Sequence, residues 1–257
     1  MFWYKSWLET RWRFGIGLAL LMVLAVGVVF DYPAVQKLMP LARNADLDAG
    51  GTLSGLIRQA AETQRDYRGY VWWQWYRQNL TQTWTVFAVL LGSGGLLSRA
   101  SDGAVLFTLS LPASRNRVLA TRAVTALAEL LVLAVIPSLL IAIFSPAVGQ
   151  RYALGDAVVH GACLFIAGAT FFSLAFLLST VFNDLWRPLL IVLATTVVLA
   201  LCEQMLRGLS RYGIFRVMTG ERYFGSGQVP WLGLLTSAAL SLAMFYGAAR
   251  NIARRDF

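Results

Sequence analysis

The chain has 257 residues, of which 58% are hydrophobic and only 14% are charged, and its mean hydropathy is +0.61. Soluble domains carry about 25% charged residues, so this chain has too few of them to cover a water-exposed surface. Its wealth of aromatic residues also excludes a disordered chain. The composition therefore predicts an integral membrane protein.

The formal net charge is +9 at pH 7, which would also suit a nucleic-acid-binding protein. In membrane proteins, however, Lys and Arg accumulate on the cytoplasmic side and beside anionic lipid headgroups. The cations of this chain are scattered and form no basic run. We therefore expect membrane lipid, and no nucleic acid, as a partner.

The first predicted element is an amphipathic helix over residues 1–13. At 100° per residue, Trp3 and Trp7 fall on one side of this helix, and Lys5 and Glu9 fall on the other. This pattern is typical of a helix that lies in the headgroup plane with its rings toward the acyl chains. The alternative is a charged overhang that precedes the first membrane span.

Six apolar segments follow, and each is long enough to cross the hydrocarbon core of a bilayer. Backbone groups inside a bilayer must be hydrogen-bonded within their own segment, so each span is predicted to be a helix. The predicted spans are 14–30, 79–97, 123–144, 158–182, 188–206 and 231–249. The predicted fold class is therefore all-α, with a single transmembrane domain over residues 1–257 and a kink at Pro137.

An even number of spans places both termini on one side of the membrane. If that side is the cytoplasm, it receives 11 Lys and Arg residues, against five in the short outer loops. The positive-inside rule then predicts a multi-pass protein of the cytoplasmic (inner) membrane with both termini in the cytoplasm. Residues 31–78 become an extracytoplasmic loop, in which a helix over 54–79 is favoured over irregular structure.

The chain lacks the sequence patterns of common membrane enzymes. Neither Lys5 nor Lys37 follows a glycine, so no P-loop for nucleotide phosphates can be present. The single histidine, His160, excludes multi-histidine metal sites, and its spacing from Asp156 places both residues on one face of a helix at the membrane interface. We therefore expect no catalytic residue, metal site or bound cofactor on this chain.

The segment 98–117 lies between the second and third predicted spans. Asp102 and Gly103 are expected to end the second span, and Pro112 is expected to end a short helix with an apolar face. Held on the cytoplasmic side by two long spans, this helix can insert into a groove of a partner protein or lie on the membrane. The residue pattern alone favours neither.

This loop resembles that of ABC type-2 transporter permeases, the six-helix membrane subunits of exporters whose ATPase is usually a separate chain. The resemblance rests on Gly103, which lies nine residues before the string Leu-Pro-Ala-Ser-Arg at 111–115, and on the position of the loop. The family often has a Glu shortly before this glycine and a Thr after it. Here Asp102 is the candidate for the acidic position, and Ala104 replaces the Thr.

The resemblance implies that residues 99–113 form a coupling helix that docks in the ATPase. It also implies that 1–13 is a connecting helix and that 207–230 contains short re-entrant helices before the last span. The partners implied are a second permease subunit, forming a homodimer, and two ATPase subunits, which bind ATP and Mg. The residues implied in coupling are Arg99, Asp102, Gly103, Leu106, Leu109, Pro112 and Arg115. The alternative class is a six-helix secondary carrier or a non-transporting scaffold.

Glu129 is the single charge well inside a predicted span. A buried carboxylate costs roughly 2.5–3.5 kcal/mol on insertion scales, so this side chain is expected to face protein or water. It is either a polar hinge or pathway residue, or a protonated or hydrogen-bonded Glu that joins the third span to its neighbours. Further along the chain, Glu203 and Arg207 are four residues apart and are expected to pair.

Overall fold

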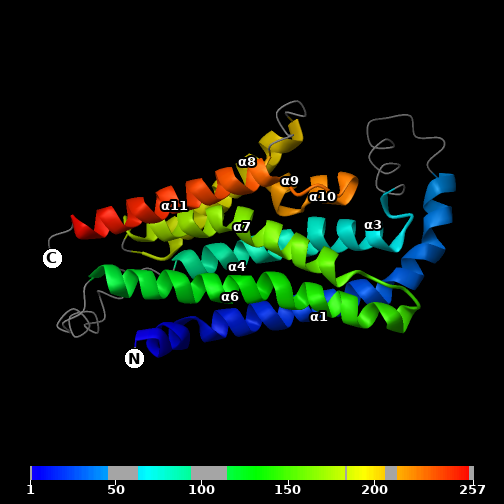
Figure 1. Ribbon diagram of the computed structural model, residues 1–257, viewed down its shortest axis with the longest axis horizontal. Helices are drawn as coiled ribbons and strands as arrows, with labels where there is room; N and C mark the ends of the chain where they lie inside the picture. The colour runs from blue at the N-terminus through cyan, green and yellow to red at the C-terminus, as the bar shows by residue number, and fades with distance from the viewer. Residues whose placement is uncertain (1, 46–62, 94–114, 183, 206–212, 255–257) are drawn as a thin grey trace.

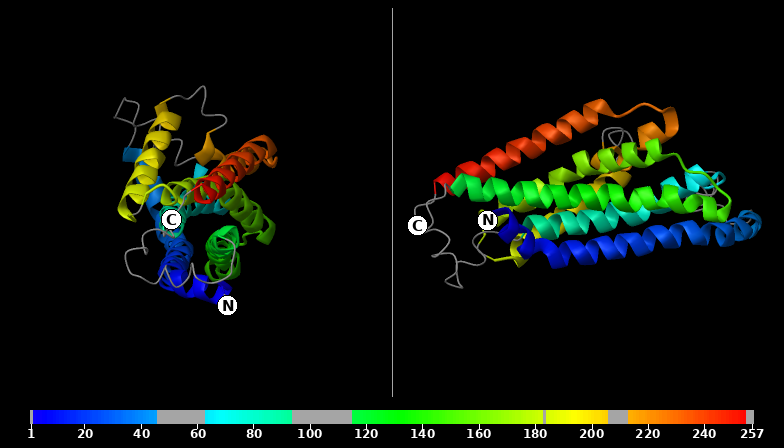
Figure 2. Two further views of the ribbon diagram at one scale, coloured as in Figure 1. Left: turned by 90° about the vertical axis from the view of Figure 1, so that its left-hand side faces the viewer. Right: turned by 60° about the horizontal axis from the view of Figure 1, so that its bottom comes forward.

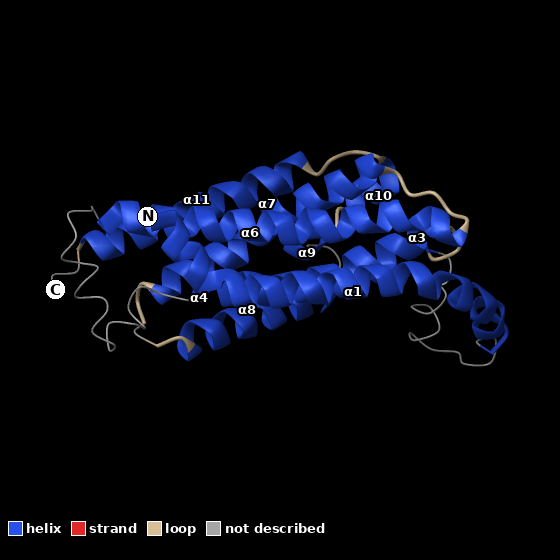
Figure 3. Cartoon of the chain, turned by 90° about the horizontal axis from the view of Figure 1, so that it is seen from below, coloured by secondary structure: helices blue, strands red, loops and turns tan. Residues whose placement is uncertain are grey.

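The computed structural model describes residues 2–45, 63–93, 115–182, 184–205 and 213–254. Within these ranges every regular element is a helix and no strand occurs (Figure 3). Five helical stretches are long and apolar enough to cross a membrane. They are Ser6–Lys37, Arg117–Val148, Leu154–Ser179, Trp186–Met205 and Trp231–Ala253. The described part of the chain is thus all-α, as predicted.

The first helix, α1, runs without a break from Phe2 to Ala45. The predicted helix over 1–13 is therefore not a separate element, because no proline occurs before Pro33 to stop the first turns from continuing into the span. Ser6 and Thr10 are buried, whereas the neighbouring Trp rings are exposed. The polar side of these turns thus packs on the protein, and the aromatic side faces outward.

Four further long helices match predicted spans closely. They are α6 (Arg115–Phe144), α7 (Leu154–Ser179), α8 (Trp186–Met205) and α11 (Trp231–Ala253). Helix α6 continues through Pro137 and is followed by a short 3₁₀ turn, η3 (Ser145–Val148). Between α8 and α11 lie two short helices, α9 (Ile214–Met218) and α10 (Glu221–Ser226).

The second predicted span lies in a helical run of three consecutive pieces. These are α3 (Tyr67–Val71), the π-helix η1 (Trp72–Leu80) and α4 (Thr81–Ser93), of 5, 9 and 13 residues. None of these pieces alone is as long as a membrane span. In the predicted extracytoplasmic loop 31–78, residues up to Ala45 extend α1, and the predicted helix 54–79 is observed from Tyr67 onward.

The helices form an elongated bundle in which both chain ends lie at the same end (Figure 1). Helix α4 ends and α6 begins at that end, whereas α3, α9 and α10 lie at the opposite end (Figures 1 and 2). Helices α4, α6 and α7 pack against one another, and α1 packs along α6. Helix α8 lies at the outside of the bundle, where it contacts α4 and α7 (Figure 2).

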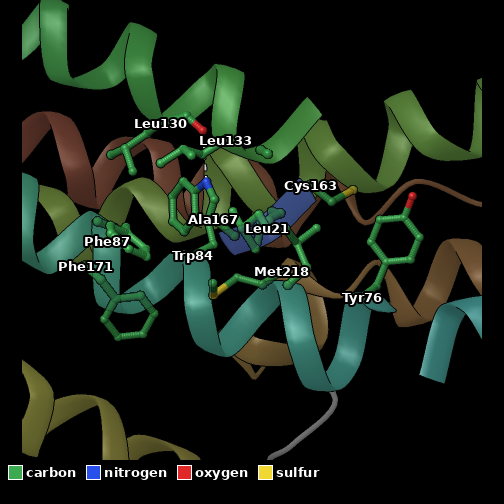
Figure 4. Packing of buried hydrophobic residues seen from close by; sticks show 14 of the residues in the cluster. Leu21, Tyr76, Trp84, Phe87, Leu130, Leu133, Cys163, Ala167, Phe171 and Met218 are labelled. Carbon is green, nitrogen blue, oxygen red and sulfur yellow. Dashed lines mark hydrogen bonds between the residues drawn. The ribbon is translucent and has the colours of Figure 1, made fainter. Parts of the chain in front are cut away.

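Close packing between α4 and α7 forms the centre of the bundle. The indole of Trp84 is fully buried and donates a hydrogen bond of 2.9 Å to the Leu130 carbonyl of α6 (Figure 4). A Cβ atom at Gly168 would lie only 2.2 Å from the Trp84 ring, and one at Gly92 would lie 2.7 Å from the Phe172 carbonyl oxygen. These glycines therefore let the two backbones approach each other closely.

Aromatic donors tie the run from α3 to α4 to its neighbours. The Tyr70 hydroxyl donates to the Val28 carbonyl of α1 at 3.0 Å, and the Trp75 indole donates to Ser138 Oγ of α6 at 3.2 Å. Tyr67 and Ser145 form a third hydrogen bond at 2.7 Å. Each polar tip thus finds a partner inside the bundle, while its ring fills space between helices.

Candidate functional site

Most of the residues implied in coupling lie outside the described part of the chain. This set comprises Arg99, Asp102, Gly103, Leu106, Leu109 and Pro112, which lie between Ser93 and Arg115. Arg115 is the first residue of α6. The segment that contains them therefore starts and finishes at the end of the bundle where the chain termini lie (Figure 1).

Glu129 lies on α6, and only 5% of it is exposed. Its Oε1 atom is hydrogen-bonded to Thr10 Oγ1 of α1 at 2.5 Å. Three residues further along α1, the Arg13 guanidinium donates to the Leu90 carbonyl of α4 at 3.0 Å. The structure thus brings together the predicted intramembrane carboxyl and the first turns of the chain. We call the contact between Thr10 and Glu129 the α1–α6 seam.

A second polar site lies at the opposite end of the bundle and joins α3, η1, α7 and α10. We call it the aromatic cluster. Its members are Arg68, Trp72, Tyr76, Asp156, His160, Tyr223 and Phe224. These residues come from three stretches of sequence that the fold brings to one place.

Asp156 is the centre of the aromatic cluster. One of its oxygens accepts a hydrogen bond of 2.8 Å from the Arg68 guanidinium, and the other accepts one of 2.9 Å from the Tyr223 hydroxyl. The pKa of the Tyr223 phenol is raised above 10.0, mainly because the phenol donates this hydrogen bond to Asp156 and would lose it on ionisation. The arrangement holds α10 against α3 and α7.

His160 is buried one turn further along α7, so the predicted shared face with Asp156 is observed. Its ring makes edge contacts with Tyr76, at 4.5 Å between centroids, and with Tyr223, at 5.4 Å. Its Nδ1 atom has no hydrogen-bond partner among the described residues. A Cβ atom at Gly220 would lie 3.0 Å from that nitrogen, and Gly220 has a φ of +62°. Glycine is therefore required here both for space and for backbone conformation.

The turn between α9 and α10 is held by the π-helix. The Trp72 indole donates to the Thr219 carbonyl at 3.0 Å, and its ring stacks on Phe224 with centroids 4.6 Å apart. A π-helix has a wider turn than an α-helix and is often found at functional sites. Here η1 presents Trp72 to the short helices and Trp75 to α6.

Glu203 fastens the start of α9 to the end of α8. Its Oε1 atom accepts a hydrogen bond of 3.1 Å from the backbone N–H of Phe215, and a Cβ atom at Gly213 would lie 2.4 Å from the carboxyl group. A carboxylate near the first turn of a helix satisfies N–H groups that the helix itself leaves free. The expected partner of Glu203, Arg207, lies outside the described residues.

The side chains at these sites can form hydrogen bonds and ion pairs and can bind protons. In the part of the chain that the structure describes, no three His, Cys, Asp or Glu side chains gather as metal ligands do. Comparisons of the chain with family models, with curated proteins and with solved structures found no match. The function is therefore inferred from the residues and the geometry of this chain.

Sequence reasoning located Glu129 but missed the aromatic cluster. The predicted helix over 54–79 includes the Trp-rich stretch at 72–75, but the contact of Trp72 with Thr219 and Phe224 cannot be read from residue spacing. Arg68 and Asp156 are 88 positions apart, so their pairing depends on the fold, which brings the start of α3 close to the start of α7. The signals available were the predicted shared face of Asp156 and His160 and the glycines that precede the short helices, Gly213 and Gly220.

Proposed function

We propose that this chain is the membrane permease subunit of an ABC exporter-like transporter of the type-2 class. It works as a homodimer in the cytoplasmic membrane, and two copies of a separate ATPase bind ATP and Mg. The observation that carries the proposal is the Gly103 to Arg115 pattern, together with its place in the fold. The segment joins α4 and α6 at the end of the bundle that also contains both termini (Figure 1).

The helix arrangement supports this proposal. In addition to the five apolar helices, the run from Tyr67 to Ser93 exceeds the ~20 residues that a crossing helix needs. We propose it as the second of six spans, with α9 and α10 as the re-entrant helices before the last span. Both termini and the segment 98–117 then lie in the cytoplasm, where an ATPase can reach them.

ATP can drive such a transporter because the ATPase, once closed around ATP, binds one arrangement of the membrane spans more tightly than the other. Closure of two ATPase subunits around ATP moves any helix docked in them, and the spans attached to that helix then favour a second arrangement. Residues 99–113 are the proposed docking helix, and α6 follows it directly. Arg115 in the first turn of α6 is therefore placed to pass the motion on.

The proposal is tested by purifying the tagged chain in mild detergent and identifying the proteins that remain bound. We expect an ATPase with a Walker A sequence in stoichiometric amount. Transport by the purified chain alone, driven by an ion gradient, would instead support a secondary carrier. A purified chain without an ATPase and without transport would indicate a scaffold.

Two substitutions test the docking segment itself. Asp102→Asn and Arg115→Ala should lower substrate-stimulated ATP hydrolysis at least tenfold while leaving membrane insertion unchanged. The matched control is Arg151→Ala, because Arg151 is exposed and lies between η3 and α7, at the opposite end of α6 from Arg115. Transport equal to that of the parent in both docking variants would contradict the assignment.

A further inference from the structure

The two oxygens of the Glu129 carboxyl have different surroundings. Oε1 is hydrogen-bonded to Thr10, whereas Oε2 is buried and has no hydrogen-bond partner among the described residues. No ion pair to Glu129 occurs within the described ranges either. A carboxylate here would leave a full negative charge on a buried group with a single neutral donor, which is strongly unfavourable.

Thr10 has one hydroxyl proton to share among three acceptors. Its Oγ1 atom lies 3.3 Å from the Ser6 carbonyl oxygen and 3.4 Å from that of Trp7, besides its contact with Glu129. If Glu129 is ionised, the proton must point at the carboxylate. If Glu129 is protonated, its own O–H donates to Thr10, and the Thr10 proton remains free for a backbone carbonyl. Only the second arrangement leaves no buried charge and satisfies every donor.

The helices packed against α6 bring little opposite charge to this site. Helices α1, α4, α7 and α11 all contact α6, and α4 contains no charged residue. Besides Glu129, the titratable and charged residues whose side chains are described on α6 and on these helices are Tyr4, Glu9, Arg11, Arg13, Asp31, Tyr32, Lys37, Arg117, Arg122, Asp156, His160, Cys163, Tyr246 and Arg250. Of these, Arg13 points to the Leu90 carbonyl, and Asp156 and His160 belong to the aromatic cluster at the other end.

We propose that Glu129 binds a proton in the folded protein and that the resulting neutral acid fastens the first turns of α1 to α6. When the proton passes to water, the carboxylate that remains has to leave the seam or draw water into it. Glu129 is thus a positioning residue, and the seam is a proton-dependent contact. The inference does not depend on what the chain transports or on which ATPase it binds.

Infrared spectroscopy of the full-length chain in lipid nanodiscs tests the protonation state directly. At neutral pH we expect a carbonyl stretching band of a protonated carboxylic acid that is lost in Glu129→Gln. The matched control is Glu203→Gln, which should keep the band because Glu203 accepts a backbone N–H. Thr10→Val should shift the frequency of the band, and Thr10→Ser, which keeps the hydroxyl, should not. A wild-type spectrum without this band, or a band that persists in Glu129→Gln, would overturn the proposal.

Unfolding measurements supply a second, independent readout. Glu129→Gln is a neutral isostere and should unfold like the parent below about pH 4, where Glu129 is protonated in both the folded and the unfolded chain, whereas Glu129→Ala should not. Between about pH 4.3, where this Glu ionises in the unfolded chain, and the higher pH at which it ionises in the folded protein, the unfolding equilibrium constant of the parent should grow by up to about tenfold per pH unit relative to Glu129→Gln. Failure of Glu129→Gln to fold, or an equal pH dependence in both proteins, would show that the seam needs no proton.

Discussion

The aromatic cluster and the α1–α6 seam join helices by different means. In the cluster, Asp156 has a cationic partner and a phenol donor, and Arg68 has about half of its side chain exposed to solvent. In the seam, Glu129 is buried, and its one hydrogen-bond partner among the described residues is the Thr10 hydroxyl. Charge can remain where opposite charge and water are near, and must be neutralised where both are absent.

The two sites also differ in the elements that each one holds together. The cluster anchors α9 and α10, two helices too short to be stable alone, to α3, η1 and α7. The seam joins two long helices that already pack along their length. Loss of the cluster should therefore release a local segment, whereas loss of the seam should change the relation between α1 and α6.

The largest effect is expected for Trp72→Ala. Trp72 is buried, stacks on Phe224 and donates to Thr219, so its removal leaves a cavity and an unpaired carbonyl. We expect the free energy of unfolding to fall by about 3 kcal/mol, measured by SDS titration in mixed micelles. The control is Trp73→Ala, which removes a partly exposed neighbour and should cost much less. Equal losses would show that Trp72 does not anchor the short helices.

The next largest effect is expected for Thr10→Val, which should lower the free energy of unfolding by about 2 kcal/mol. This change removes the hydrogen-bond partner of a buried carboxyl while keeping its shape. The same SDS titration measures it, and Thr10→Ser should stay within about 0.5 kcal/mol of the parent. If valine is tolerated as well as serine, the seam is held by packing and the contrast between the two sites disappears.

Asp156→Ala should lower the free energy of unfolding by less, about 1 kcal/mol, because Arg68 is well exposed and water compensates the lost ion pair. We also expect faster proteolytic cleavage near α10, since Tyr223 loses its acceptor. The matched control is Arg187→Ala at the other end, which breaks the exposed pair with Asp184 but keeps the hydrogen bond from the backbone N–H of residue 187 to Asp184. That control should change neither the unfolding free energy nor the cleavage rate.

The smallest effect is expected for Tyr223→Phe, which should lower the free energy of unfolding by about 0.5 kcal/mol because it removes one partly exposed hydrogen bond. The raised pKa of the Tyr223 phenol means that folding favours its protonated form. Its contribution is therefore fully present below pH 10 and is lost as the pH rises through the higher pKa of the folded state. Unfolding titrations at neutral and alkaline pH should show the two proteins converging at high pH. A difference that grows with pH would have the wrong sign.

Hydropathy predicted the long helices well because apolar length is what a bilayer requires. The predicted spans over 158–182 and 188–206 differ from α7 and α8 by a few residues. The predicted span over 123–144 lies inside α6, which begins eight residues earlier, at Arg115, because charged turns continue a helix beyond its apolar part. For the same reason, the predicted helix over 1–13 and the predicted span over 14–30 form one helix, α1.

The candidate sites were less predictable. A lone carboxyl in an apolar run identified Glu129, but its partner Thr10 lies 119 residues away and was placed on a different helix. The π-helix has no pattern that distinguishes it from an α-helix in sequence, since Trp72 and Trp75 are presented to different neighbours only by the wider turn. Pairings of this kind depend on packing, which spacing alone does not contain.

The unbroken length of α1 has a mechanical consequence. A helix of 44 residues rises by about 66 Å at 1.5 Å per residue, roughly twice the ~30 Å thickness of a hydrocarbon core. The helix is held at Thr10, near its start, and again at Val28, whose carbonyl accepts a hydrogen bond from Tyr70, 17 residues before the helix ends at Ala45. A tilt that begins at either contact is therefore passed to the other along a stretch of helix that contains no proline.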